Sequence, residues 1–263
     1  MRQFVSWRTL SLGSSLVSNQ TPSTLPNKPR IAVSACLAGE AVRYDGDHKR
    51  HPQVVGLLAS LFELIPVCPE VEIGLGIPRE PIQLEQTTAG IRLVAVQSRQ
   101  DYTLRMQQFA RRTAAQIESW QACGYLLKSR SPSCGLHNVK LFDNTGSFQR
   151  TGRGIFAQEL EQHGQGLPFA EESVLEDDGT REHFVEQVQA FHQLRGCLSE
   201  SWNPARMLQF HSAYQLQLES HDTDGTQQLE KLVGRIETTA PGSFQVEYRE
   251  QFLKILAQPM ATV

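Results

Sequence analysis

The stretch "IAVSACLAGE", residues 31–40, opens with an apolar run and continues into small and polar residues. The run from Ile31 to Ser34 is short and almost uniformly apolar, which is typical of a strand buried on both faces of a sheet. The chain then enters a predicted loop that contains Cys36. The first strand of the fold is therefore expected to deliver a thiol at its carboxyl end.

Strands and helices alternate around this stretch. Residues 54–61 carry apolar side chains at helical spacing, and residues 64–68 form a second predicted strand that ends at Cys68. Further predicted strands are residues 91–96, 125–128 and 139–143, with a last short element at 167–172, and further predicted helices are residues 103–123 and 152–164. Gly124 is expected to end the helix over 103–123. The alternation favours an α/β fold, with a mainly parallel, Rossmann-like sheet covered by helices on both faces.

The sequence changes character from about residue 177. Residues 180–196 form a predicted helix, and "SWNP" at 201–204 interrupts it. Three later segments repeat apolar residues every three or four positions, as amphipathic helices do. We expect a disordered extension over 1–28, an α/β domain over 29–176, a connecting helix and linker over 177–203, and a small all-α domain over 204–263.

The composition is that of an ordinary globular protein. The 263 residues are 40% hydrophobic and 20% charged, and a net charge of -3 gives no global attraction for nucleic acid. No apolar run approaches the roughly 18 residues of a membrane span. Five cysteines without a secretory signal favour reduced thiols and a cytoplasmic location. Residues 1–28 lack acidic groups, so a weak organellar presequence is an alternative to a disordered tail or an early start codon.

Three cysteines, Cys36, Cys68 and Cys134, each follow a predicted strand. Because the carboxyl ends of parallel strands meet at one edge of a sheet, these thiols are placed where they can converge. The interpretations are a structural zinc site completed by a histidine, an iron-sulfur site, or unrelated core thiols. Zinc is disfavoured because the paired C-x2-4-C spacing is absent. Three thiolates on a cluster would leave one iron open to substrate.

The sequence motifs around these cysteines resemble those of a known family. "VSACLAGEAVRYDG" (33–46), "PVCPEVEIGLGIPREPIQL" (66–84) and "LKSRSPSCGLHNVKLFD" (127–143) are similar, in this order, to the thiouracil desulfidase (TudS) family. "ARMLQFHSAYQLQLESHD" (205–222) and "LEKLVGRI" (229–236) resemble the start of the YbgA-type second domain of two-domain members.

The resemblance implies a [4Fe-4S] cluster bound by Cys36, Cys68 and Cys134. It implies a hydrolytic, non-redox cleavage of a carbon-sulfur bond in thiolated uracil, which yields the oxo base and sulfide. The expected partner is a thiolated nucleobase, nucleoside or RNA, with 4-thiouridine in RNA or RNA fragments as the substrate of two-domain members. No membrane partner is expected.

Several polar residues near the cysteines are candidates for the chemistry. The candidates for proton transfer are Glu40, Asp45, Glu70, Ser131 and Ser133, and those for substrate binding are Lys128 and Arg130. Carboxylates and hydroxyls move protons, and the two cations can bind phosphate or stabilise negative charge. A cap or a loop ion pair is an equally open interpretation of each acid. Two rival functions also stay open, a non-catalytic iron-sulfur module that senses redox state or recruits a partner, and an enzyme for the free nucleobase.

The aromatic and imidazole groups of the C-terminal helices have less specific interpretations. Phe210 and Tyr214 could stack on bases, but at helical spacing they favour a core. His211 and His221 lie far from the cysteine motifs in sequence, so surface or capping roles are expected for them. Cys123, at the end of an apolar stripe, is expected to be a core residue.

Overall fold

The computed structural model describes residues 28–164, 166–199 and 201–260. The expected disorder of the N-terminal extension falls on residues 1–27, which lie outside the described residues. The elements in chain order are β1 (Arg30–Ser34), α1 (Ala35–Ala38), the π-helical η1 (Val54–Leu58), α2 (Ala59–Leu61), β2 (Glu63–Val67), α3 (Pro69–Glu72), β3 (Ile82–Thr87), β4 (Gly90–Ala95), α4 (Thr103–Trp120), β5 (Ala122–Leu127), β6 (Val139–Phe142), β7 (Phe148–Gly152), α5 (Ile155–His163), β8 (Phe169–Glu171), the 3-10 helical η2 (Glu172–Leu175), α6 (Asp178–Ser199), α7 (Pro204–His221), α8 (Thr223–Val233) and α9 (Pro241–Leu256).

A parallel sheet forms the centre of the α/β part. Its strand order is β2-β1-β5-β8, and every neighbouring pair is parallel. All six residues of β5 are buried, because the apolar run "ACGYLL" lies between helices on both sides. The mixed α/β class and the parallel sheet expected from the sequence are confirmed.

A bulge in β5 sets how the helices pack on this sheet. Arg30 and Ala32 of β1 pair with Ala122 and Tyr125, so β5 holds one extra residue between these pairs. A Cβ on Gly124 would lie 2.6 Å from Val188 Cγ2 in α6, so glycine is what allows this helix to approach the strand.

Tyr125 points to the other face of the sheet, where its ring meets Phe156 of α5 edge to face. The expectation that Gly124 ends the preceding helix is wrong, because α4 ends at Trp120 and Gln121 takes the left-handed cap with φ 54°.

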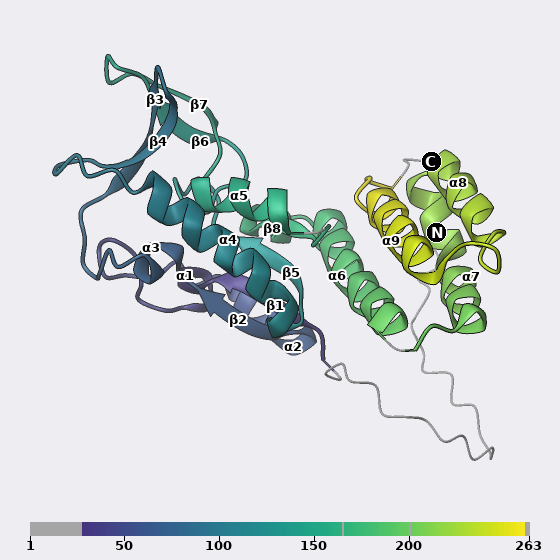
Figure 1. Ribbon diagram of the computed structural model, residues 1–263. Helices are drawn as coiled ribbons and strands as arrows, with labels where there is room; N and C mark the ends of the chain where they lie inside the picture. The colour runs from purple at the N-terminus through teal and green to yellow at the C-terminus, as the bar shows by residue number, and fades with distance from the viewer. Residues whose placement is uncertain (1–27, 165, 200, 261–263) are drawn as a thin grey trace.

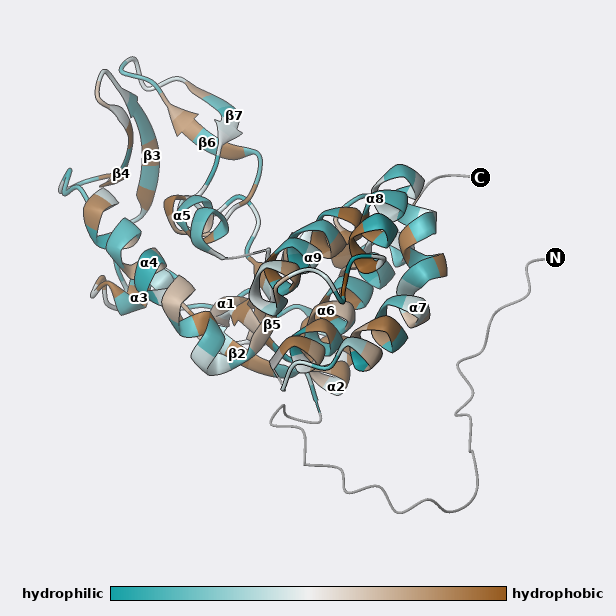
Figure 2. Cartoon of the chain, turned by 45° about the vertical axis from the view of Figure 1, so that its right-hand side comes forward, coloured by the Kyte–Doolittle hydropathy of each residue, from teal (hydrophilic) through white to brown (hydrophobic). Residues whose placement is uncertain are grey.

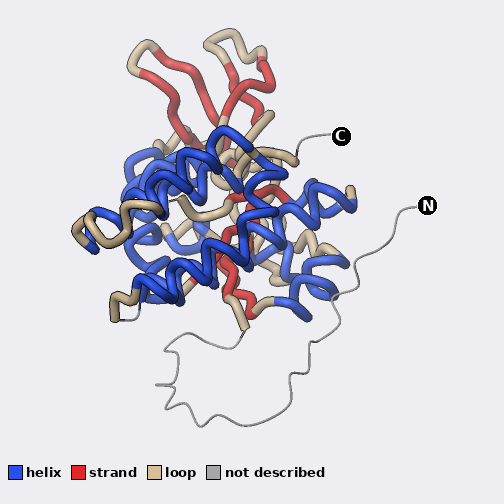
Figure 3. The backbone as a smooth tube through the Cα atoms, turned by 90° about the vertical axis from the view of Figure 1, so that its right-hand side faces the viewer, coloured by secondary structure: helices blue, strands red, loops and turns tan. Residues whose placement is uncertain are grey.

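A second, mixed sheet has the order β4-β3-β6-β7. The β3–β4 and β6–β7 pairs are antiparallel and project from the rest of the molecule (Figures 1 and 3). The sequence predicted β4 and β6 but missed β3 and β7, and it expected one sheet. The sequence does not predict β3 and β7 because neither contains the buried apolar run by which the other strands are predicted. Most of their side chains are polar and partly or fully exposed.

Helices α6 to α9 surround a second hydrophobic cluster, which includes Leu194, Leu218 and Phe252. They match the helix expected over 180–196 and the three later amphipathic segments, and Figure 2 shows hydrophobic and hydrophilic residues on the same helices. α6 lies between this cluster and the parallel sheet (Figure 1), because Phe184 and Val188 join the core of the sheet while Leu194 joins the second cluster. None of the described helices combines the length and the apolar character that a membrane span requires.

Candidate functional site

The three thiols that follow β1, β2 and β5 line one cavity of about 260 Å³. Cys68 comes directly after β2, and Cys134 lies in the loop that follows β5. Cys36 was expected in a loop but lies in the short helix α1, directly after β1. Parallel pairing brings the three strand ends to one edge of the sheet, and the thiols meet there.

The protein environment holds these thiols in the neutral form. Burial, followed by the nearby Cys68, raises the pKa of Cys36 to about 11. Burial, followed by Glu70 and the other two thiols, raises the pKa of Cys134 well above its ordinary value. Burial also raises the pKa of Cys68. A cation bound by these groups would have to displace their protons, so its binding would release protons.

The spacing of the sulfurs distinguishes between kinds of metal group. Thiolates on one tetrahedral ion lie about 3.8 Å apart, given metal-sulfur bonds of about 2.3 Å. Among the described residues, one group of three His, Cys, Asp or Glu side chains has its ligand atoms all within 4.8 Å of one another, and it lies elsewhere, in α6 and α7. The three thiols do not form such a group. At least one pair of the three sulfurs is therefore more than 4.8 Å apart, wider than the spacing on one tetrahedral ion, which fits a larger metal-sulfur group between them.

A buried hydroxyl lies within electrostatic range of two of these thiols. Tyr125 is fully buried in β5, and its Oη has no hydrogen-bond partner among the described residues. Burial, followed by Cys134 and Cys68, raises its pKa well above the ordinary value, so the hydroxyl keeps its proton near those sulfurs. A metal-sulfur group would give this orphan donor an acceptor.

The loop that carries Cys134 is fixed by its own backbone and by the start of α5. Ser131 Oγ accepts hydrogen bonds from the backbone N–H groups of Ser133 and Cys134, at 3.2 and 3.1 Å. At the start of α5, the Ala157 N–H donates to the Ser133 carbonyl at 3.1 Å. A Cβ on Gly154 would lie 2.3 Å from that carbonyl oxygen, so this approach needs glycine.

Two carboxylates at the end of β8 hold the two sides of the same loop. Glu172 accepts from Lys128 Nζ and from the backbone and side chain of Ser129, and Glu171 accepts from the backbone of Leu136 at 2.7 Å. Burial by itself raises the pKa of Glu172, but the bonds from Lys128 and Ser129 outweigh it and lower the pKa below its ordinary value. Sequence reasoning missed both acids, although the pair "EE" at the end of a predicted element was a signal.

A third network places Glu70 at the cavity wall. Its Oε2 accepts from Arg79 Nη2 at 2.6 Å and Nε at 3.0 Å, and its Oε1 accepts from Ser133 Oγ at 2.9 Å. The side chain of Arg79 is only 4% exposed and also donates to the Val42 carbonyl at 2.9 Å. Glu70 is thus held in one orientation from two sides, and the sequence did not predict Arg79.

The other sequence candidates occupy different positions. Ser131 and Lys128 line the cavity, whereas Ser133 is buried behind it and donates to Glu70. Glu40 and Asp45 do not line it; Glu40 is exposed, and Asp45 forms an ion pair of 3.3 Å with Arg43.

The mouth of the cavity is basic and aromatic. Arg43, Tyr44, Lys49 and Arg130 line it. Tyr44 is 43% exposed, and the Arg43 guanidinium lies 5.5 Å from the centre of its ring. Within the described ranges, neither Lys49 nor Arg130 has an ion-pair partner. A planar base and an anionic group are the ligands that such a rim can receive.

A larger cavity of about 750 Å³ lies between the segment before β8 and helix α9. Leu167, Phe169 and Leu253 are among its lining residues, and no cysteine lines it. The smaller cavity carries the thiols, the fixed carboxylate and the basic rim, and its chemistry rather than its size makes it the candidate site.

The fold and this cavity define a mixed α/β protein with a three-thiol centre suited to a thiophilic metal group. The profile of the 2-thiouracil desulfurase family matches residues 31–172, and the chain belongs to this family. The match spans the three cysteine motifs and confirms the thiouracil desulfidase family expected for this part of the chain.

Two individual proteins resemble the same part. The uncharacterized protein YbbK of Bacillus subtilis (strain 168) is 31% identical over 140 residues, which cover 51% of this chain and 91% of that protein. The solved structure of the [4Fe-4S]-dependent thiouracil desulfidase TudS is 30% identical, with a TM-score of 0.47, covering 57% of this chain and 94% of that one.

Proposed function

We propose that this protein is a [4Fe-4S]-dependent desulfidase that converts thiolated uracil into the oxo base and sulfide. The observation that carries the proposal is the meeting of Cys36, Cys68 and Cys134 in one cavity within the stretch that matches the family. These three residues hold the cluster. The cluster supplies an iron without a protein ligand, whose soft character suits the sulfur of the base.

Glu70 accepts the proton of the attacking water. The net reaction exchanges the sulfur of C=S for the oxygen of water and releases hydrogen sulfide, so no oxidant or reductant is consumed. Glu70 lines the cavity, and Arg79 and Ser133 fix both of its carboxylate oxygens. Because a general base acts only in the right orientation, these two partners are positioning residues.

Ser131 and the basic rim orient the substrate. The Ser131 oxygen already accepts two backbone hydrogen bonds, so its O–H is left to donate into the cavity. Lys128 is engaged by Glu172 and holds the loop, whereas Arg130 and Lys49 bind the phosphate of a nucleotide at the mouth. Tyr44 stacks on the base or on a neighbouring base.

The rim favours 4-thiouridine carrying phosphate, in RNA or RNA fragments, over the free base. In this proposal residues 29–176 form the Rossmann-like desulfidase domain. Residues 177–203 connect it to residues 204–263, an all-α, YbgA-type domain that helps to hold RNA. The second hydrophobic cluster around α7 to α9 supports this division. The reduced thiols of the site suit the cytoplasm.

The direct test is turnover by protein purified without oxygen. We expect sulfide release from 4-thiouracil, 4-thiouridine and thiolated tRNA, with the highest kcat/KM for a phosphate-bearing substrate. Replacing Lys49 and Arg130 together by alanine is expected to remove that preference and leave turnover of 4-thiouracil unchanged. An iron-loaded protein that releases no sulfide from any of the three would favour the redox-sensing or partner-recruiting module instead.

A further inference from the structure

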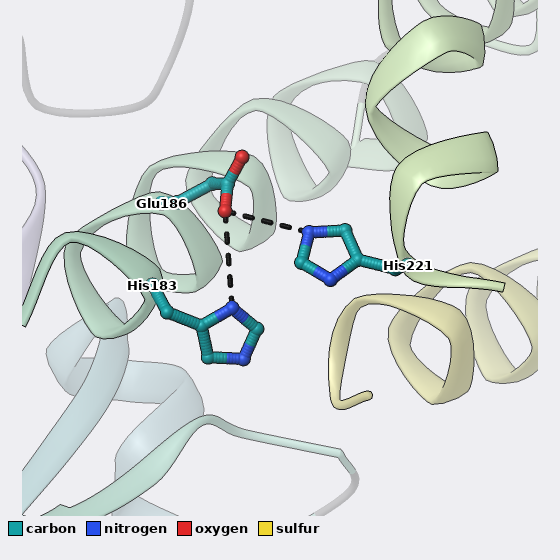
Figure 4. Close-up of side chains that lie close together, drawn as sticks. All are labelled: His183, Glu186 and His221. Carbon is teal, nitrogen blue, oxygen red and sulfur yellow. Dashed lines mark ion pairs between the residues drawn. The ribbon is translucent and has the colours of Figure 1, made fainter. Parts of the chain in front are cut away.

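A second group of metal-ligand side chains lies outside the thiol cavity, where the end of α7 meets α6 (Figure 4). His183 and Glu186 are three residues apart in α6, so they project from the same face of the helix. His221 is the last residue of α7. The three ligand atoms all lie within 4.8 Å of one another, and the family match over residues 31–172 does not reach them.

The distances approach those of a coordinated ion. Glu186 Oε2 lies 3.5 Å from His221 Nε2 and 3.9 Å from His183 Nδ1. Nitrogen and oxygen ligands of one tetrahedral zinc ion lie about 3.4 Å apart, given bonds of about 2.1 Å. Small side-chain movements would therefore bring all three groups into one coordination sphere.

His221 directs one nitrogen of its ring at this group. Its side chain is fully buried, and its Nδ1 lies 2.7 Å from the backbone carbonyl of Gln258. A carbonyl only accepts, so Nδ1 carries a proton, and Nε2 faces the Glu186 carboxylate, with which it forms an ion pair when the ring is protonated. An ion bound between the two groups would take the place of the Nε2 proton. Among the described residues Nε2 has no hydrogen-bond partner. Metal-bound histidines are commonly oriented by such an N–H bond to a backbone carbonyl.

His183 completes the group from the more open side. Its Nδ1 is also buried without a hydrogen-bond partner in the described part of the chain, and Gln187 contacts its Nε2 at 2.9 Å. The Gln187 amide nitrogen also donates to the Leu256 carbonyl at 2.9 Å. Ligation through Nδ1 would place the ring proton of His183 on Nε2, so the Gln187 amide would have to give up its bond to Leu256 and turn its oxygen toward that proton. The side chains of His183 and Glu186 are 21% and 30% exposed, which gives an ion a path and a position for water.

We infer that His183, Glu186 and His221 bind one divalent transition-metal ion of the zinc type, with water as a further ligand. Two imidazoles and one carboxylate suit Zn²⁺ and its neighbours better than Mg²⁺ or Ca²⁺, which prefer oxygen ligands. The ion would join α6, the end of α7 and, through Gln258, the segment after α9. Because α6 contributes to both hydrophobic clusters, this site would fix the C-terminal helices to the α/β part.

Zinc titration of the cluster-loaded protein tests this inference. Zn²⁺ is added without oxygen in competition with a chromophoric chelator, and iron is measured in parallel. We expect one zinc ion per chain without loss of iron, and a higher melting temperature of the wild type. Glu186→Gln is expected to weaken zinc binding by at least about tenfold, as changes around metal sites do, whereas Glu182→Gln, an exposed glutamate of the same helix, leaves it unchanged.

A second pair of variants repeats the comparison of zinc affinity at a different ligand. His221→Asn removes the proposed ligand, and His163→Asn, which changes an exposed histidine of α5, is its control. His221 is buried, so His221→Asn can fail to fold for reasons unrelated to metal binding. In that case the milder Glu186→Gln alone tests whether these side chains bind zinc. Equal zinc affinity in wild type and Glu186→Gln would overturn the inference and leave a proton-bridged ion pair. Zinc uptake matched by loss of iron would assign the metal to the thiols and overturn it as well.

Discussion

At the scale of single residues, Glu70 is the carboxylate that the structure fixes at the wall of the thiol cavity. Glu70→Gln keeps the shape of the side chain and removes its capacity to accept a proton. We expect kcat to fall by about 10²- to 10⁴-fold, the usual contribution of a general base, with unchanged iron content. The matched control is Glu72→Gln, an exposed acid of the same short helix, which should retain activity. Parallel loss of iron and activity in Glu70→Gln would make Glu70 structural.

Tyr125 offers a second residue-scale prediction. Its orphan hydroxyl lies near Cys134 and Cys68, and hydrogen bonds to sulfur stabilise the reduced, more negative state of a cluster. Tyr125→Phe should therefore shift the reduction potential to a more negative value, as measured by a redox titration followed by electron paramagnetic resonance. Tyr102→Phe, whose hydroxyl donates to Gln100, serves as the control. Identical potentials in wild type and Tyr125→Phe would mean that the hydroxyl does not reach the cluster.

At the scale of elements, the contact between β5 and α6 depends on the absence of a side chain at Gly124. Gly124→Ala would place a Cβ 2.6 Å from Val188, and we expect overpacking to lower the free energy of unfolding by about 1–3 kcal/mol. Trimming the neighbour in Gly124→Ala/Val188→Ala should recover part of that loss, as urea unfolding would report. Gly56→Ala, with open space around it, is the control. If the losses of unfolding free energy in Gly124→Ala and Val188→Ala simply add in the double variant, the contact between position 124 and Val188 does not cause the destabilisation.

The fastening of the Cys134 loop by Glu172 predicts a pH dependence. The pKa of Glu172 is lower in the folded protein, so its contribution is present above the unfolded pKa of about 4.3 and is lost as the pH falls through the folded value. Glu172→Gln should lower the free energy of unfolding by about 1.5–3 kcal/mol at pH 7, the range for hydrogen bonds to charged groups, and by less at pH 3.5. Urea unfolding at both pH values checks this against Glu176→Gln, an exposed neighbour. A penalty that is independent of pH would exclude the charge as its source.

At the scale of the whole molecule, the sequence predicted the parts that burial dictates. The strands β1, β2 and β5 contain apolar runs, and parallel pairing makes the convergence of Cys36, Cys68 and Cys134 a consequence of topology. The exposed strands β3 and β7 carry no comparable pattern, so the second sheet was missed.

Tertiary contacts explain the remaining omissions. Glu172 lies far along the chain from Lys128, and only the pairing of β5 with β8 brings the two together. His221 was expected at the surface or as a cap, but it is buried against α6, because a contact between two helices leaves no local signal in either one. Its partner in that contact is Glu186, a polar residue of an ordinary amphipathic helix.

His211 was also expected at the surface or as a cap and is buried as well, with its ring 3.1 Å from the Tyr248 hydroxyl. Phe210 and Tyr214 pack in the second cluster, as their helical spacing predicted.

The measurement that tests the central claim most directly is the iron and acid-labile sulfide content of protein purified without oxygen. The claim predicts four irons per chain in the wild type and loss of the cluster when Cys36, Cys68 and Cys134 are replaced together by serine. Cys123→Ser, which changes a buried thiol on the α6 side of β5, should keep the four irons. Iron and sulfide retained at wild-type levels in the triple variant would contradict the claim that these three thiols hold the cluster.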